Sequence, residues 1–309
     1  MSKRIVIALG GNALGNTAAE QLQLVTETAK SIVDLIAAGN EVVVAHGNGP
    51  QVGMINLGLS TAAEAKAIKA DMPFPECGAM SEGYIGYHLQ QAIGNELASR
   101  GMDKPVATIV TQTVVSKDDP AFQNPTKPVG AFYDKETADR IAAEKGYTMV
   151  EDAGRGYRQV VPSPKPIDVI EKRTVNALIA SGTVVITVGG GGIPVVRKDG
   201  KLYGTPAVID KDFASAKLAE LVKADALVIL TAVDRVCINY GKPDQKALDE
   251  MSIAEAEQYC AEGHFAPGSM LPKVKAAISF AQTGGTAIIA SLEHAGKAVR
   301  GESGTKVHL

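Results

Sequence analysis

The chain lacks tryptophan altogether, and aromatic residues make up only 5% of its 309 residues. So few aromatic side chains leave little surface on which nucleic-acid bases could stack. An excess of charge is also lacking, because 31 Lys and Arg residues against 34 Asp and Glu residues give a net charge of −3. Proteins that bind nucleic acid usually carry a clear basic patch. We therefore expect no nucleic-acid partner.

Long hydrophobic runs and cysteines are scarce as well. No apolar run reaches the roughly 20 residues that a membrane span needs, and a strand-like segment that begins by Arg4 predicts no signal peptide before it. The three cysteines, Cys77, Cys237 and Cys260, are odd in number and lack metal-ligand spacing. We expect reduced thiols in a cytoplasmic protein that does not enter a membrane.

Short apolar runs rich in β-branched residues are the main feature that is present. They are Arg4–Leu9, Glu41–Ala45, Val106–Val115, Thr183–Val188, Ala226–Val233 and Thr286–Ala290. Apolar and polar residues do not alternate in them, as they would in a strand with one exposed face. Continuous runs are typical of parallel strands that helices cover on both faces.

Helical patterns separate these runs. In the first, apolar residues recur at helical spacing from Leu22 to Ile36, and Gly39 with Asn40 ends the pattern. The others are Cys77–Arg100, Lys211–Ala224 and Leu271–Thr283. Alternating strands and helices predict a three-layer α/β/α sandwich with a mainly parallel open sheet.

Two segments depart from this alternation. Ser116–Pro166 contains six prolines, many charges and little periodicity, and an unstructured loop of that length is uncommon in a compact domain. We expect a small protruding subdomain or a lid there. Val195–Gly204 has an Asp-Gly pair between two extended stretches, which predicts a β-hairpin.

Three of the predicted strands end in glycine-rich loops, at Leu9–Gly15, His46–Gly53 and Gly189–Pro194. The carboxyl ends of parallel strands meet at one edge of a sheet, where ligands bind. Glycine lets backbone N–H groups approach an oxyanion, and the N-terminus of a following helix adds a favourable dipole. One such loop could be merely a turn, but three at one edge predict a phosphate site.

Two standard phosphate motifs nearly fit. Gly10–Thr17 has the spacing of a Walker A loop, but Asn16 stands where the lysine belongs. Gly47 to Gly53 resembles a relaxed dinucleotide fingerprint, but no acidic residue ends a strand some 20 positions later. If the protein handles phosphate, its positive charge must come from lysines elsewhere in the chain.

The motifs together resemble the carbamate kinases, which belong to the amino acid kinase family, from about Lys3 to Leu309. They are ALGGN at Ala8–Asn12, HGNGPQV at His46–Val52, NPTKPVG at Asn124–Gly130, EDAGRGYRQVVPSPKP at Glu151–Pro166, GGGGIPV at Gly189–Val195, VIDKDFAS at Val208–Ser215, DALVILTAVDRVCINYG at Asp225–Gly241 and GHFAPGSMLPK at Gly263–Lys273. NPTKPVG and DAGRGYRQVVPSPKP discriminate best, because acetylglutamate, aspartate and uridylate kinases look different there.

The resemblance implies reversible transfer of a phosphoryl group, in which ATP and carbamate give ADP and carbamoyl phosphate with Mg²⁺. It implies a homodimer of single-domain chains, with residues 1–190 as the carbamate half, residues 191–309 as the nucleotide half, and residues 116–166 protruding over the substrate. In fermenting bacteria such enzymes usually run toward ATP at the end of arginine catabolism. The alternatives are an amino acid kinase for another carboxylate, or a non-catalytic relative that senses nucleotides.

The resemblance also implies roles for particular residues. Lys127, Lys211 and Lys273 would surround the phosphoryl group, and Asp212 would orient the two catalytic lysines. The plainer alternatives are solvated surface lysines and, for Asp212, an N-cap or an acidic residue in the first turn of a helix. His46 adjoins a phosphate loop, but carbamate is already an oxyanion nucleophile that needs no base, so we expect a structural role for it.

The remaining implied residues fall into two groups, and no protein ligand for the metal is among them. Gly10, Gly11, Asn12, Gly47, Asn48, Gly49 and Gly191 would bind substrate and phosphate. Gly190, Val233, Asp234, Tyr240, Pro267 and Met270 would bind the nucleotide. For the glycines a role as turns alone stays open, and Asp234 could be an ordinary aspartate at the end of a strand.

Overall fold

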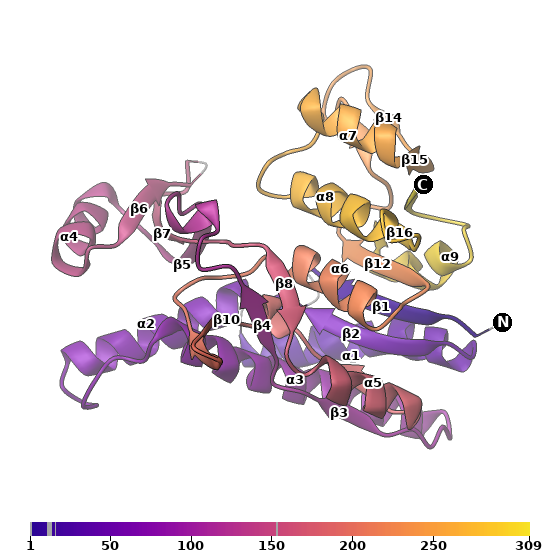
Figure 1. Cartoon of the computed structure of the whole chain (residues 1–309), viewed down its shortest axis with the longest axis horizontal. Helices are drawn as coiled ribbons and strands as arrows, with labels where there is room; N and C mark the ends of the chain where they lie inside the picture. Colours follow the sequence, from indigo (N-terminus) through magenta and orange to yellow (C-terminus); the bar gives the residue numbers. More distant parts are fainter. Residues whose placement is uncertain (1, 11–13, 16, 153) are drawn as a thin grey trace.

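A computed structural model describes residues 2–10, 14–15, 17–152 and 154–309. Its middle layer is an eight-stranded sheet with the order β15-β17-β16-β12-β1-β2-β9-β3, in which only β16 and β17 pair antiparallel (Figure 1). The strands are β1 (Arg4–Leu9), β2 (Glu41–His46), β3 (Val106–Thr108), β9 (Val184–Ile186), β12 (Ala226–Thr231), β15 (Glu250–Ser252), β16 (Thr286–Ser291) and β17 (Thr305–His308). The predicted mainly parallel open sheet is confirmed.

Helices cover both faces of this sheet. They are α1 (Ala18–Ala37), α3 (Phe74–Ser99), α5 (Lys172–Ala180), α6 (Lys211–Leu221), α7 (Ile253–Ala261), α8 (Met270–Ala281) and α9 (Ala295–Val299). The helix α2 (Gly49–Glu64) packs instead on α3 and on the inserted segment. Successive residues of β1 enter different cores: Ile5 and Ile7 pack with α1 and α3, whereas Val6 and Ala8 pack with α6 and α8. Burial on both faces explains why the apolar runs do not alternate, and it confirms the three-layer sandwich. In the described part of the chain, no helix is both long and apolar enough to cross a membrane.

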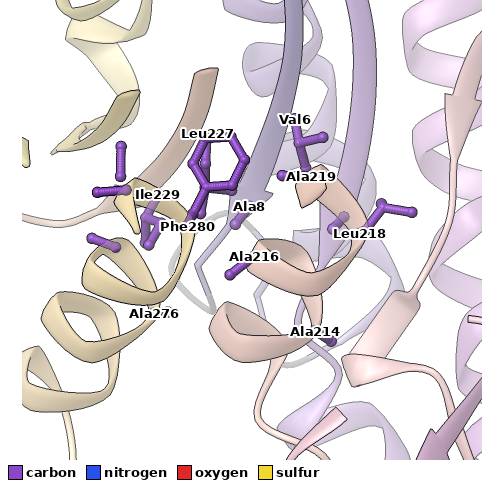
Figure 2. Packing of buried hydrophobic residues seen from close by; sticks show 14 of the residues in the cluster. Val6, Ala8, Ala214, Ala216, Leu218, Ala219, Leu227, Ile229, Ala276 and Phe280 are labelled. Atoms are coloured by element: carbon purple, nitrogen blue, oxygen red, sulfur yellow. The ribbon is translucent and has the colours of Figure 1, made fainter. Parts of the chain in front are cut away.

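Small side chains let α6 and α8 approach the sheet and each other closely. Ala216 and Ala219 of α6 and Ala276 of α8 are buried in the same core cluster as Ala8 of β1 (Figure 2). Alanines at these positions fill the interior without holding the helices apart. The N-termini of α6 and α8, which begin at Lys211 and Met270, are thereby brought near each other.

A second, four-stranded sheet has the order β11-β10-β4-β8. Its strands are β4 (Gln112–Val115), β8 (Pro166–Val169), β10 (Ile193–Lys198) and β11 (Lys201–Gly204). The predicted hairpin is confirmed, with Val195 paired to Gly204 and positive φ angles of 50° and 73° at Asp199 and Gly200. Two successive positive φ angles match the tight turn that suits the twist of a hairpin.

The single strand predicted for Val106–Val115 is wrong, because the chain changes sheets inside it. β3 pairs with β9 in the main sheet, whereas β4 pairs with β10 and β8 in the second sheet. Between them the backbone N–H of Thr111 donates to the Glu82 carboxylate of α3 over 2.7 Å. This contact with a helix replaces the sheet hydrogen bond that a continuous strand would make.

Within the inserted segment a small antiparallel sheet stands away from the rest of the molecule (Figure 1). Its order is β5-β7-β6, with β5 (Lys127–Tyr133), β6 (Thr148–Glu151), β7 (Tyr157–Val161) and the helix α4 (Lys135–Lys145). We call this unit, residues 127–161, the protruding subdomain. It rests on α2, where a Cβ atom on Gly53 would lie only 2.9 Å from Cα of Gly130, and where Lys145 pairs with Glu64 over 2.5 Å.

Candidate active site

The candidate site lies at the carboxyl edge of the main sheet, where the loops after β1, β2, β9 and β12 meet. Gly10, Gly47 and Val233 follow three of these strands directly or within two residues, and Gly190 lies four residues after β9. This edge is where open α/β sheets bind ligands. The predicted phosphate-binding residues Gly11 and Asn12 lie outside the described residues.

Asp212 lies between two lysines at this edge. Its Oδ1 is 2.5 Å from Nζ of Lys211, and its Oδ2 is 3.0 Å from Nζ of Lys273. The Asp212 side chain is 3% exposed, and those of Lys211 and Lys273 are 13% and 16% exposed. The structure therefore brings three of the four predicted catalytic residues together, from the first turns of α6 and α8. We call this arrangement the lysine clamp.

The lysine clamp keeps a net positive charge. Burial alone would raise the pKa of Asp212, but the two neighbouring ammonium groups outweigh burial and hold that pKa below its ordinary value. Asp212 thus remains a carboxylate. Two cations against one anion leave one positive charge over, which favours an anionic ligand at this edge.

Lys127 reaches the same edge from the protruding subdomain and pairs with Asp210. Its Nζ donates to Oδ2 of Asp210 over 2.7 Å, while Oδ1 of Asp210 accepts the backbone N–H of Asp212 over 2.9 Å. Asp210 is the N-cap of α6 and Asp212 is an acidic residue in its first turn, so the N-cap alternative for Asp212 is wrong and the first-turn alternative is confirmed. Our sequence reasoning missed Asp210, although an aspartate just before a predicted helix is a favoured cap.

Two glycines of the predicted phosphate loops make room for the segment that carries Asp210 and Lys211. A Cβ atom on Gly47 would lie 3.3 Å from Cδ of Lys211, and one on Gly191 would overlap the carbonyl oxygen of Ile209. The N–H of Gly47 donates to the Leu9 carbonyl over 3.3 Å, and that of Gly191 donates to the Val188 carbonyl over 3.0 Å. These two N–H groups are therefore used inside the protein, and the glycines serve close packing.

The predicted loop residues Asn48, Gly49 and Gly190 surround the start of α2. Gly49 is the first residue of that helix, so the positive end of its dipole lies at the carboxyl edge of the sheet. Asn48 is the N-cap residue of α2, but its side chain makes no capping hydrogen bond; its Nδ2 donates to Oγ of Ser81 over 2.9 Å. A Cβ atom on Gly190 would overlap the Asn48 amide, so the loops after β2 and β9 touch each other here.

Two further ionisable groups behind these loops are buried. Burial, together with the nearby charge of Lys211, lowers the pKa of His46 to about 4, although its Nδ1 contacts the Gly47 carbonyl at 2.8 Å. Burial raises the pKa of Glu82 well above its ordinary value, against the opposing effect of the Thr111 N–H. Burial therefore favours the protonated form of Glu82 over the carboxylate.

The residues predicted to bind the nucleotide lie on two neighbouring segments. Val233 and Asp234 follow β12, and Asp234 accepts hydrogen bonds from the Ser291 hydroxyl and, over 2.7 Å, from Nδ1 of His294, which lowers its pKa. Tyr240 is 70% exposed. Pro267 is exposed ahead of α8, and Met270 is its first residue.

A hydrogen bond joins these two segments. The backbone N–H of Asn239 donates to Nδ1 of His264 over 3.4 Å, next to the ring of Tyr259, which meets His264 edge-on. The segment after β12 and the segment before α8 are thus neighbours, and both adjoin the elements that carry the lysine clamp. An elongated anion with an apolar end could contact all three.

Comparison with known proteins agrees with this architecture. The sequence model of the Amino acid kinase family matches residues 3–291. The chain is 56% identical to the carbamate kinase of Clostridium perfringens over 98% of this chain and 99% of that protein, and 57% identical to the Carbamate kinase-like protein YqeA of Escherichia coli over 99% of each. The solved structure of the Giardia lamblia carbamate kinase bound to AMP-PNP superposes with a TM-score of 0.92 at 45% identity, covering 99% of this chain and 98% of that one. The chain belongs to the amino acid kinase family.

Proposed function

We propose that the protein is a carbamate kinase, which transfers a phosphoryl group reversibly between ATP and carbamate. The observation that carries this proposal is the lysine clamp, Lys211–Asp212–Lys273, together with Lys127 reaching the same edge from the protruding subdomain. Relatives from four of the organisms compared, at 54–58% identity over nearly the whole chain, are carbamate kinases.

Phosphoryl transfer requires positive charge in fixed positions more than it requires covalent help from the protein. Asp212 fixes the positions of these charges, because each of its oxygens binds one ammonium group and so keeps Lys211 and Lys273 close to each other. Carbamate enters as an anion and attacks with its own oxygen. No general base is needed, which agrees with a buried, neutral His46.

The two substrates would approach the lysine clamp from different sides. The Giardia relative was solved with the ATP analogue AMP-PNP bound, and this chain shares its fold over nearly its full length. We assign ATP or ADP to residues 191–309, with Val233, Asp234, Tyr240, Pro267 and Met270 around the nucleoside. Carbamate or carbamoyl phosphate belongs to residues 1–190, beneath the protruding subdomain and near Lys127.

The nucleotide would enter as its Mg²⁺ complex. Among the described residues there is no group of three or more His, Cys, Asp or Glu side chains that could hold a metal ion, and Asp210 and Asp212 already pair with lysines. Mg²⁺ accepts phosphate oxygens and water as ligands, so this site fits a metal that arrives with its nucleotide. When bound, the ion neutralises part of the phosphate charge.

We further infer a homodimer that forms through the exposed side of α3. Met80 and Tyr87 lie seven residues apart, on one face of that helix, and are 41% and 57% exposed. Exposed apolar residues in such a row are typical of a surface that another chain covers. We retain the expectation of a cytoplasmic enzyme that runs toward ATP in arginine catabolism.

The test is direct synthesis of ATP. Purified protein with ADP, Mg²⁺ and carbamoyl phosphate should form ATP, and acetyl phosphate should give no comparable rate. In the other direction, N-acetylglutamate or aspartate should not replace carbamate. The variant Lys273→Ala should lose the activity, whereas Lys275→Ala, which removes an exposed lysine from the same helix, should keep it.

The same assay separates the alternatives. A clear preference for another carboxylate would identify a different amino acid kinase. Nucleotide binding without any transfer would identify a sensing relative. Against the second alternative, the chain retains Lys127, Lys211, Asp212 and Lys273 in mutual contact or close to one another.

A further inference from the structure

We propose that Asp210 is a positioning residue that holds Lys127 of the protruding subdomain in register with the lysine clamp. The inference rests on the proposed function for its effect on catalysis. It rests on the structure alone for the contact itself. Asp210 would thus place Lys127, which the protruding subdomain carries, beside Lys211 and Lys273.

Asp210 is an anchored carboxylate. One of its oxygens accepts the backbone N–H of Asp212 at the first turn of α6, so the side chain is fixed to the helix before Lys127 arrives. The other oxygen accepts Nζ of Lys127 over 2.7 Å. Because the carboxylate is already ordered, pairing with the lysine sacrifices less conformational freedom than an ordinary surface ion pair does.

The same residue connects the subdomain to every member of the lysine clamp. It lies next to Lys211 in the sequence, binds the backbone of Asp212, and through Asp212 is linked to Lys273. A displacement of Asp210 would therefore move Lys127 relative to the other two lysines. A misplacement of about 1 Å in a catalytic group can cost about a hundredfold in rate.

The other contacts between the subdomain and the framework do not act on the Lys127 side chain. Lys145 pairs with Glu64, and Gly53 packs on Gly130, both along α2. A backbone hydrogen bond of 2.9 Å joins Val208 to the Pro162 carbonyl, just beyond the subdomain. Among the described residues, Lys127 forms its ion pair with Asp210, and without that carboxylate three ammonium groups would repel one another at this edge.

The ion pair between Lys127 and Asp210 is partly exposed, so an incoming substrate anion can replace the Asp210 carboxylate as the partner of Lys127. The Lys127 side chain is 35% exposed and that of Asp210 is 15% exposed, in contrast to the nearly buried lysine clamp. A partly solvated ion pair is weak enough for a phosphate oxygen to share or replace it. Asp210 thus presents Lys127 to the incoming anion in the required position.

The variant Asp210→Asn separates positioning from capping. Asparagine caps helices about as well as aspartate, so α6 and the melting temperature should be preserved. The charge that holds Lys127 is lost. We expect kcat/KM for carbamoyl phosphate to fall about tenfold, which is the loss that one hydrogen bond to a charged group explains, while calorimetry gives wild-type ADP affinity.

A double-mutant cycle with Lys127→Ala tests whether Asp210 acts through that lysine. In the Lys127→Ala background, Asp210→Asn should lower kcat/KM no further. The matched control is Asp168→Asn: Asp168 also accepts a backbone N–H, from Val169, and a lysine Nζ, from Lys172 over 2.6 Å, but on β8. This control should leave kcat/KM unchanged.

Acylation of lysines followed by mass spectrometry tests the contact without any reaction. Asp210→Asn should speed the labelling of Lys127 severalfold in the substrate-free protein, and Asp168→Asn should speed that of Lys172 instead. If wild-type protein forms no ATP from carbamoyl phosphate, the proposed function fails, and the labelling still decides the contact. Unchanged labelling of Lys127 overturns the proposal, as does a loss of kcat/KM that persists in the Lys127→Ala background.

Discussion

The variant Asp212→Asn should destabilise the protein far more than a surface substitution does. Asparagine has nearly the shape of aspartate, so the change removes the negative charge and little else. Two ammonium groups, with side chains only 13% and 16% exposed, then lie near each other without a counter-ion. Removing one partner from a buried ion pair costs about 3–5 kcal/mol. Because both lysines keep some access to water, we expect the low end, about 3 kcal/mol.

Asp152→Asn is the matched control for this prediction. Asp152 also binds two cations, Arg155 over 3.0 Å and Arg158 over 3.1 Å, whose side chains are 61% and 18% exposed, but its own side chain is 16% exposed against 3% for Asp212. Solvent screens such a pair, and its loss should lower the free energy of unfolding by about 1 kcal/mol or less. Urea unfolding followed by circular dichroism measures both variants against the wild type.

The negative charge of Asp212 leads to two further expected results, one with added anions and one with pH. Phosphate or sulfate should stabilise Asp212→Asn more than wild type, because the anion replaces the missing carboxylate between Lys211 and Lys273. The pKa of Asp212 is lowered in the folded protein, so its contribution is complete above the ordinary value of 3.8 and is lost as the pH falls below it. Equal costs for Asp212→Asn and Asp152→Asn, with no effect of anions, would refute the idea that Asp212 holds two buried lysines.

Three other predictions concern Lys127, His46 and the exposed face of α3. Lys127→Ala should raise the KM for carbamoyl phosphate and lower kcat about a hundred- to a thousandfold, with ADP affinity unchanged in calorimetry; lost ADP affinity would mean that the subdomain covers the nucleotide. His46 has a folded pKa of about 4 against 6.5 in the unfolded chain, which therefore binds more protons in between. Protonation of His46 in the unfolded chain should lower the free energy of unfolding by about 3 kcal/mol from pH 6.5 to pH 4. In His46→Asn the amide can replace Nδ1 at the Gly47 carbonyl, and urea titrations of this variant should show a smaller decrease over the same pH range. An equal slope in both proteins would contradict a buried, neutral His46. Tyr87→Asp should convert a dimer into monomers by light scattering, and a variant that stays dimeric would exclude this face of α3.

Most of the main sheet could be predicted because burial on two faces leaves a strong local signal. Arg4–Leu9 matches β1 at both ends, and Thr286–Ala290 is one residue shorter than β16. Val106–Val115 carries the same signal but forms two strands in two sheets, because the Glu82 carboxylate, distant in the sequence, takes the Thr111 N–H. The local strand propensity of a segment carries no information about such a tertiary contact.

In the candidate site, too, contacts between sequence neighbours could be predicted from local sequence and contacts between distant residues could not. Lys211 and Asp212 are adjacent, so a sequence motif can present them together. Lys273 lies 61 residues from Asp212, and only the resemblance to a family connects the two. Lys127 and Asp210 are 83 residues apart, and their pairing depends on how the protruding subdomain packs. Asp210 itself was predictable as a helix cap, but its second partner was not.

The room that Gly47 leaves for Lys211 has a consequence for mutational scanning. A Cβ atom there would lie 3.3 Å from Cδ of the lysine, so even alanine requires the stem of Lys211 to shift by a few tenths of an ångström. A scan that scores growth or turnover would then group Gly47 with the lysines and aspartates of the site. It has no side chain, and its N–H is already donated to Leu9. Loss of activity on substitution of Gly47 would therefore show that the stem of Lys211 needs this space. It would not show that Gly47 takes part in the chemistry.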